Sequence, residues 1–182
     1  EFVFIEGTFA IEKTDVKSGA DVLADGNVAA SSGDGVDDKI DTTLKIGGTL
    51  TKAFIGAGYG STDQVGVLAT SGSFGVVIYK TVDQSLTTQA ASKMAAKGTL
   101  GSLSFVGVTG LDITATNLAV EVNRTGETLT GVTVATGGTP ATVDMSFSTT
   151  ADVTRASGAV TLKVQEFVFI EGTFAIEKTD VK

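Results

Sequence analysis

The sequence predicts an all-β protein built as an elongated β-solenoid-like tandem repeat, with strands that continue across the boundary between copies. Antiparallel β-sandwich repeats are the alternative fold. Three observations carry this prediction. Residues 1–17 recur unchanged as residues 166–182. The chain has 23 Gly and one Pro and is rich in Thr, Ser, Val and Ala, which suits strands joined by tight turns. Most segments also alternate apolar and polar residues with the period of a half-buried strand.

The exact duplication indicates a tandem array, because an old duplication would have accumulated differences. The period is 165 residues, the offset from Glu1 to Glu166. Residues 1–165 are therefore interpreted as one complete repeat and residues 166–182 as the start of the next. Arrays of near-identical repeats serve length, spacing or multivalency more often than catalysis.

Composition argues against several classes of function. The net charge is −8, whereas nucleic-acid binding needs clustered Lys and Arg, so we expect no nucleic-acid partner. The chain has no His and no Cys, so the usual Ser-His and Cys-His nucleophiles cannot form, and we expect no enzyme. No apolar run approaches the ~18–20 residues of a membrane span, so we expect no membrane insertion.

The elements follow in order along the chain. It opens in a strand-like run, and residues 18–41 form an acidic loop insertion. Residues 85–97 have a helical composition but no apolar stripe of helical period, so a short helix and a further strand fit equally well. Strands separated mostly by Gly, Asn and Ser turns are expected at residues 42–55, 65–82, 100–113, 117–123, 128–134, 142–147 and 151–153.

The boundary between copies falls inside an alternating stretch. From Val160 to Lys178, most apolar residues are at even positions and most polar residues at odd positions. This predicts one long strand or two collinear strands with a bend near Gly172. The boundary has no Pro and no Ser/Gly spacer, so one copy's strand is expected to complete the next copy's sheet. The predicted junction residues are Phe2, Phe4, Val164, Phe167, Val168, Phe169 and Ile170.

The four phenylalanines of this junction set leave two interpretations open. They lie on the otherwise polar side of the alternating stretch, so they are either a second core layer or a hydrophobic seam between neighbouring copies or chains.

A smaller motif recurs within the repeat: Gly, then Thr or Ser, then Phe or Leu. Repeated Gly within strands suggests a stacked column of corners, as in a β-solenoid, although Gly-Thr pairs also arise by chance in a chain of this composition. The motif begins at Gly7, Gly48, Gly72, Gly98 and Gly172.

One acidic cluster could hold a metal ion. Asp34, Asp37, Asp38 and Asp41 lie close together in the sequence, and Ca²⁺ prefers oxygen ligands from flexible acidic loops. The spacing matches no complete EF-hand. A solvated acidic loop is the alternative, so Ca²⁺ is the one candidate cofactor and otherwise none is expected.

Residues 4–13, 101–107 and 117–123 resemble repeats of giant bacterial extracellular proteins, which are adhesin-like or calcium-binding. The resemblance implies an extracellular or cell-surface location, a structural or adhesive role and no catalytic residues. It also implies adjacent identical repeats or subunits as partners, and other cells or surfaces beyond them. Two alternatives stay open: a carbohydrate or cell-surface binding module, and a fibre subunit that polymerises by strand donation.

Overall fold

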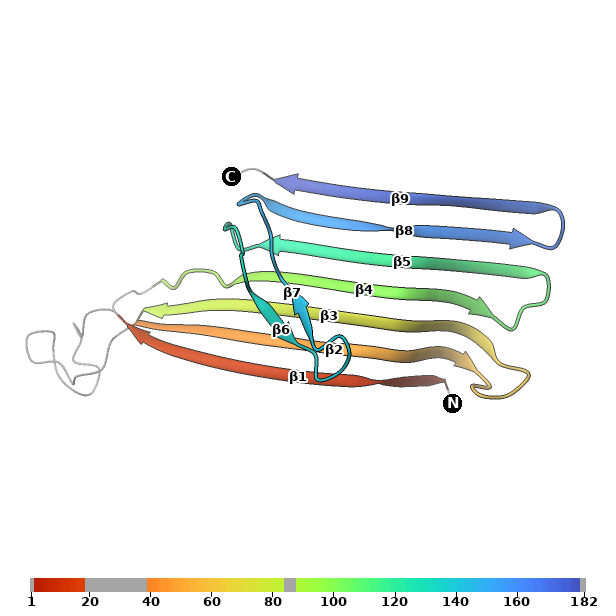
Figure 1. Cartoon of the computed structure of the whole chain (residues 1–182), viewed down its shortest axis with the longest axis horizontal. Helices are drawn as coiled ribbons and strands as arrows, with labels where there is room; N and C mark the ends of the chain where they lie inside the picture. Colours follow the sequence, from red (N-terminus) through yellow and green to blue (C-terminus); the bar gives the residue numbers. More distant parts are fainter. Residues whose placement is uncertain (1, 19–38, 84–87, 181–182) are drawn as a thin grey trace, which may run out of the picture.

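The computed structural model describes residues 2–18, 39–83 and 88–180, and it is all-β. Seven long strands form one open antiparallel sheet in the order β1-β2-β3-β4-β5-β8-β9 (Figure 1). The all-β prediction is confirmed, the solenoid character is not confirmed, and the sandwich alternative stays open. The strands are β1 (Val3–Ser18), β2 (Lys39–Ala57), β3 (Val65–Asp83), β4 (Lys93–Val106), β5 (Leu111–Arg124), β8 (Asp152–Val164) and β9 (Val168–Asp180).

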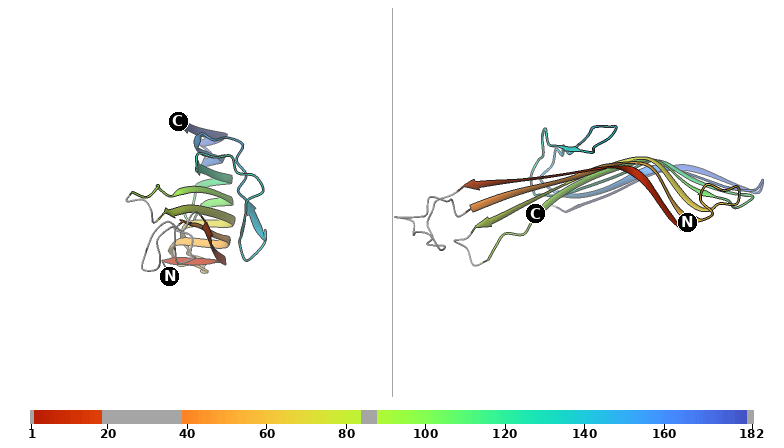
Figure 2. Two further views of the ribbon diagram at one scale, coloured as in Figure 1. Left: turned by 90° about the vertical axis from the view of Figure 1, so that its left-hand side faces the viewer. Right: turned by 90° about the horizontal axis from the view of Figure 1, so that it is seen from below.

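The chain between β5 and β8, residues 125–151, crosses one face of the sheet; we call it the excursion. It carries the short strands β6 (Thr133–Ala135) and β7 (Thr142–Asp144), which stand off the sheet as a second layer (Figure 2). The face under the excursion is the covered face, and the opposite one is the open face.

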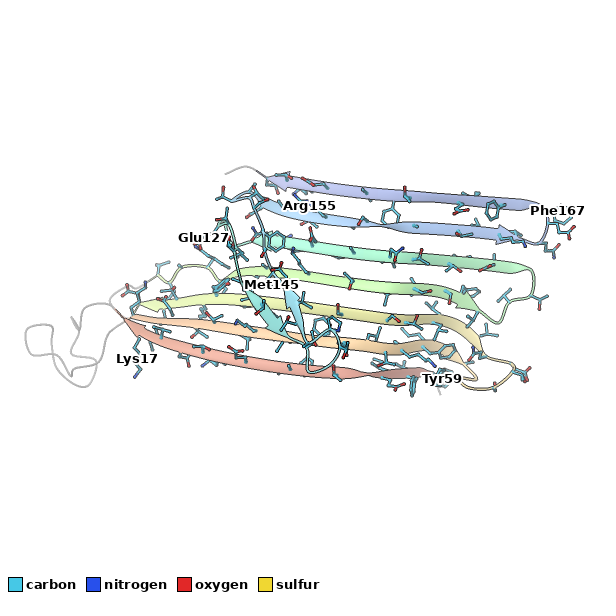
Figure 3. All side chains as sticks on the ribbon, in the orientation of Figure 1. Lys17, Tyr59, Glu127, Met145, Arg155 and Phe167 are labelled. Carbon is cyan, nitrogen blue, oxygen red and sulfur yellow. The ribbon has the colours of Figure 1, made fainter. Side chains whose placement is uncertain are left out.

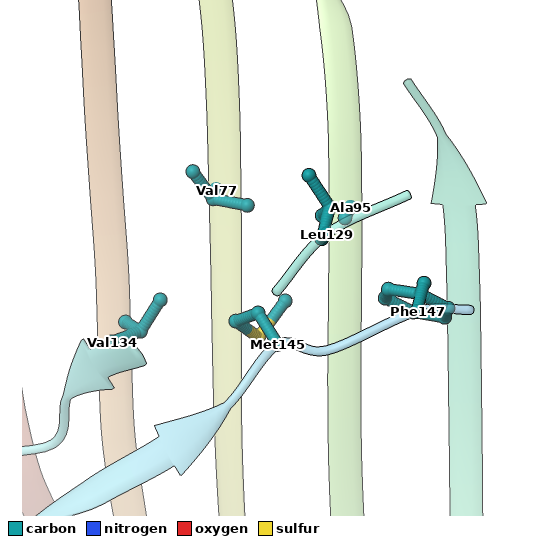
Figure 4. Close-up of a cluster of buried hydrophobic side chains, with 6 residues drawn as sticks. All are labelled: Val77, Ala95, Leu129, Val134, Met145 and Phe147. Atoms are coloured by element: carbon teal, nitrogen blue, oxygen red, sulfur yellow. The ribbon is translucent and has the colours of Figure 1, made fainter. Parts of the chain in front are cut away.

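The core lies between the excursion and the sheet (Figure 4). Two glycines of the sheet let the excursion approach closely. A Cβ on Gly47 would lie 2.2 Å from the carbonyl oxygen of Ala135, and one on Gly75 would lie 3.0 Å from Met145 Sδ. The core cluster consists of Val77 and Ala95 from the sheet and Leu129, Val134, Met145 and Phe147 from the excursion.

Asn123 fixes both ends of the excursion. Its side chain is fully buried, and Nδ2 donates to the carbonyl oxygens of Glu127 at 3.1 Å and Thr149 at 3.2 Å. The hydroxyl of Thr125 donates to Asn123 Oδ1 at 2.7 Å. The entry and the exit of the excursion are thereby tied to the end of β5.

A transverse row of irregular positions crosses the sheet. Thr51, Ser71, Gly101 and Asn117 lie opposite one another on β2 to β5, between regularly paired positions. Ser71 and Asn117 have φ of 59° and 52°, in the left-handed region. At such a position the alternation shifts by one residue, so even-numbered residues lie on one face before it and on the other face after it. The strand also bends there. The sheet is bent along its length (Figure 2).

Four copies of the recurring motif also form a transverse row, on β1 to β4, and the copy at Gly172 lies on β9 two residues from the end of that row. Thr8 Oγ1 lies 2.6 Å from Thr49 Oγ1, and Ser73 Oγ lies 3.0 Å from Thr99 Oγ1, all on the covered face. The motif copies are therefore lateral neighbours. They alternate in direction within an antiparallel meander instead of stacking as successive turns.

The expected strand over residues 160–178 is wrong. The structure reverses the chain at residues 165–167, so β8 and β9 form a hairpin in which Val164 pairs with Val168. The physical reason is parity: a three-residue turn pairs even positions with even positions. The apolar residues of β8 and those of β9 then lie on the same face of the sheet. The alternation in the sequence therefore continues unchanged through the reversal and gives no sign of it.

Other boundaries also differ from the prediction. The expected strand at 100–113 spans the end of β4, a turn at Gly107–Gly110 and the start of β5. Residues 39–41 of the expected insertion belong to β2. Residues 93–97 are strand, and no helix occurs in the described part of 85–97.

We predict that Met145→Ala lowers the free energy of unfolding by about 2–5 kcal/mol, because it empties the centre of the core under the excursion. Urea denaturation measures this effect. Val108→Ala, at a half-exposed turn, is the control and should change the free energy by less than about 0.5 kcal/mol. Equal effects of the two substitutions would show that the excursion does not pack on the sheet.

Candidate assembly interface

The two copies of the repeated segment form the two opposite edges of the sheet. β1 pairs with β2 on one side only, and β9 pairs with β8 on one side only. Their sequences are identical, so any difference between them comes from the neighbouring strand. In Figure 1 they are the outermost strands at the two sides of the sheet.

β1 uses its even-numbered residues to bond to β2. The carbonyl oxygen of Phe2 accepts a hydrogen bond from the N–H of Gly56 at 3.0 Å. Backbone groups of successive residues point to opposite sides of a strand, so even residues face β2 and odd residues face outward. The register shift beside Glu6 adds its extra residue to β2, which leaves the alternation along β1 intact.

β9 uses the opposite backbone edge of the same segment. The N–H of Gln165 donates to the carbonyl oxygen of Gly110 at 2.7 Å, so odd residues of β8 face β5 and even residues face β9. β8 and β9 pair even with even throughout, as Leu162 with Ile170. Even positions of β9 correspond to odd positions of β1. Each copy therefore leaves free the edge that the other copy uses.

The two copies also present the same side chains to the same face. Thr8 and its counterpart Thr173 lie on the covered face, and Phe9 and its counterpart Phe174 lie on the open face. A transverse row that starts at Phe9 ends at Ile176, the counterpart of Ile11. The two copies are thus staggered by two residues across the sheet, which preserves the identity of each face.

Phe174 of β9 packs over a glycine of the neighbouring strand β8. A Cβ on Gly158 of β8 would lie 3.2 Å from the ring of Phe174, so the ring covers the glycine. Phe174 is 37% exposed, whereas its counterpart Phe9 is 60% exposed. The glycine beside Phe9, Gly48, is already covered by the ring of Phe74. Phe9 therefore lacks the type of neighbour that its copy has.

Charged side chains form a row across the covered face that ends at β9. Lys97 Nζ lies 3.1 Å from Glu121, which lies 3.5 Å from Arg155 Nη1. Arg155 Nε donates to Glu177 at 2.7 Å (Figure 3 labels Arg155). Glu12, the counterpart of Glu177, lies 3.7 Å from Lys45 of β2. The same carboxylate therefore meets a cation on either side.

These contacts change the acidity of the groups involved. Hydrogen bonds from Thr179 and then from Arg155 hold the pKa of Glu177 below its ordinary value of 4.5. The hydrogen bond to Glu177 raises the pKa of Arg155. Both shifts favour the charged pair between β8 and β9.

The predicted junction residues lie in several different surroundings. Phe4 stacks on Tyr59 with ring centroids 4.3 Å apart, whereas its copy Phe169 is exposed and lies opposite Lys163. Phe167 is at the turn and is 84% exposed (Figure 3). The remaining junction residues are Phe2, which is also exposed, and Val164, Val168 and Ile170, which lie at the turn end of the β8–β9 hairpin.

The predicted calcium ligands are only partly described. Asp34, Asp37 and Asp38 lie outside the described residues. Asp41 is in β2, where Lys39 Nζ is 3.4 Å away and the hydroxyl of Thr81 donates to Oδ1 at 2.5 Å. Among the described residues, no group of three or more metal-ligating side chains is placed to hold an ion.

The comparisons with known proteins give no relative: no family model matches the chain, and neither does a curated protein or a solved structure. In the described ranges, no helix is long and apolar enough to cross a membrane.

Acid titration tests the contact between β8 and β9. The folded pKa of Glu177 is lowered, so its contribution to stability is complete above pH 4.5 and is lost as the pH falls through the folded pKa. We predict that Thr179→Val or Arg155→Gln raises the titration midpoint of Glu177 toward 4.5 in NMR spectra. Lys178→Gln, which removes the nearby pair with Asp180, is the control and should leave that midpoint unchanged.

Proposed function

We propose that the chain is a structural repeat unit of a long extracellular filament or giant surface adhesin, in which identical copies join into one continuous sheet. The observation that carries the proposal is the use of opposite backbone edges by the two copies of residues 1–17. The contact between units is then a strand shared by two sheets, in place of a single strand that runs straight across the boundary.

The shared strand follows from the equivalence of β9 and β1. In an array, one segment would pair with β8 of its own unit through one edge and with β2 of the next unit through the other. Both pairings occur in this structure, each with the side chains on the same face. Six strands then make one unit, and the sheet would advance by about 29 Å per unit at ~4.8 Å per strand.

Side chains support the same joint. In the array, the carboxylate seen as Glu12 and as Glu177 would lie between Arg155 of one unit and Lys45 of the next, continuing the alternating row of charges. The ring seen as Phe9 and as Phe174 would cover Gly158 and lose part of its exposure. An array would also pair the edges that a lone unit leaves open to unspecific strand pairing.

The extracellular part of the proposal rests on the resemblance of residues 4–13, 101–107 and 117–123 to repeats of bacterial surface proteins. The lack of Cys fits it, since identical copies with free thiols would crosslink under oxidising conditions. Residues 166–182 carry −2 of the net charge of −8, so each 165-residue unit would add −6, which would keep an array soluble. Other cells or surfaces would be the adhesive partners.

A second candidate is a fibre of separate chains that join by strand donation. The free edges of β1 and β9 favour it as much as they favour a covalent array, because the strand pairing is the same. The mass of the native chain distinguishes the two. The binding-module alternative gains no support, because Tyr59 is stacked on Phe4 and packs against Phe54.

Hydrogen exchange in a two-unit chain, residues 1–165 followed by 1–182, tests the shared strand. In the 182-residue chain, odd residues of β9 direct their amides outward, so these amides should exchange fast and the even ones slowly. In the two-unit chain we predict that both sets are protected in the junction strand. Fast exchange of the odd amides in both chains would rule out the shared strand.

Proline substitution provides a matched control at adjacent positions. Ile176→Pro removes an amide that bonds to β8 and should destabilise both chains. Ala175→Pro removes an amide that points away from β8, so in the 182-residue chain it should lower the free energy of unfolding less than Ile176→Pro does. We expect Ala175→Pro to cost about 1–3 kcal/mol more in the two-unit chain, because a strand bond is lost there.

A further inference from the structure

The open face of the sheet is apolar from one edge to the other. Cross-strand partners share a face, so the register of the strands defines transverse rows of side chains. One row holds only large apolar residues, and it reaches both edges of the sheet. Its members are Val3, Ile55, Val67, Phe105, Ile113, Leu162 and Ile170.

Two further rows of this face combine large apolar residues with glycines. Over β1 to β4 the two kinds alternate between neighbouring strands, so the large side chains lie across the glycines. The ring of Phe74 lies 2.7 Å from where a Cβ on Gly48 would be. Leu100 lies over Gly72 in the same way, with Cδ1 3.2 Å from where a Cβ on Gly72 would be. A shallow apolar groove of about 300 Å³ runs along these residues.

Among the residues that the structure describes, charged groups lie only at one end of the open face. By register and alternation, the first ones are Lys13 on β1, Arg124 on β5 and Lys178 on β9. Lys13 and Lys178 form ion pairs within their own strands, with Asp15 at 2.7 Å and Asp180 at 2.8 Å. The face between that end and the turn at residues 165–167 carries no charge.

The size of this surface corresponds to a protein interface. Four charge-free rows over seven strands span about 26 by 34 Å, or about 900 Å² of sheet, at ~3.3 Å per residue and ~4.8 Å per strand. A stable interface buries about 800 Å² on each partner. The excursion covers the opposite face, and within the described residues no segment packs on the open one.

We propose that the open face packs against the open face of a second copy of this chain, as a two-layer sheet with a two-fold axis. A copy supplies what the surface requires: an uncharged, apolar face of equal extent, with its charges at the rim. Sheets that bury one apolar face against another pack about 10 Å apart. This contact is separate from the edge contact of the array and does not depend on it.

Two matched double variants of the 182-residue chain test the proposal. Val120→Lys with Val160→Lys places two charges on the open face, at side chains that are 51% and 36% exposed. Thr114→Lys with Thr161→Lys places the same charges on the opposite face, at a cross-strand pair of the same two strands. Analytical ultracentrifugation over a range of concentrations then gives the dimer dissociation constant.

We expect the unaltered chain and the threonine variant to dimerise alike, and the valine variant to have a dissociation constant at least about 100-fold higher. If the unaltered chain stays monomeric over the range of concentrations, the proposal is overturned. Equal association of both variants would also overturn it, because that result assigns the dimer to the sheet edges. Failure of the edge contact is read separately, from amide exchange in the two-unit chain.

A spin label gives a second measurement that does not depend on charged variants folding. The chain has no Cys, so Val120→Cys and Thr114→Cys each accept one label. With rising protein concentration, the label at 120 should become protected from a soluble relaxation agent, and the label at 114 should not. Equal accessibility of the two labels at every concentration would contradict the face-to-face contact.

Discussion

The unpaired backbone groups along the two outer strands are the constraint on which this structure depends. A sheet edge is a row of strong donors and acceptors, and proteins protect such edges or use them. Here one seventeen-residue sequence forms both edges, and it is paired through a different side in each place. A single segment thus meets two sets of neighbours, which restricts the residues it can contain. Glu12 meets a cation in both environments, since it lies near Lys45 and its copy Glu177 contacts Arg155.

The two faces of the sheet are stabilised in different ways. The covered face has a local core under the excursion, and the glycines at 47 and 75 set how closely that segment approaches. The open face contributes apolar area without a described layer over it. Large side chains there lie over neighbouring glycines, an arrangement that recovers some of the packing lost where a strand has no side chain. A thin sheet can therefore carry distinct contacts on its faces and its edges.

Much of this fold could be predicted from the sequence, but the positions where alternation changes could not. Composition and period-two patterning identify strands, and β2 and β3 lie close to the expected ranges. The reversal at residues 165–167 was missed because its loop length preserves parity. The row at Thr51, Ser71, Gly101 and Asn117 also gives no clear signal, since only one of the four is Gly. The duplication marked the segment that forms both edges of the sheet, whereas the contacts of Arg155 and Gly158 required the strand register.

The stagger of two residues between the copies has a consequence for the outline of an array. Each unit would be displaced by about 6.6 Å along its strands for every ~29 Å of advance. The excursions would all lie on the same face of the continuous sheet. They would be spaced at a constant interval along a line that is oblique to the strands. The array would therefore present any group attached to an excursion at evenly spaced sites along its axis.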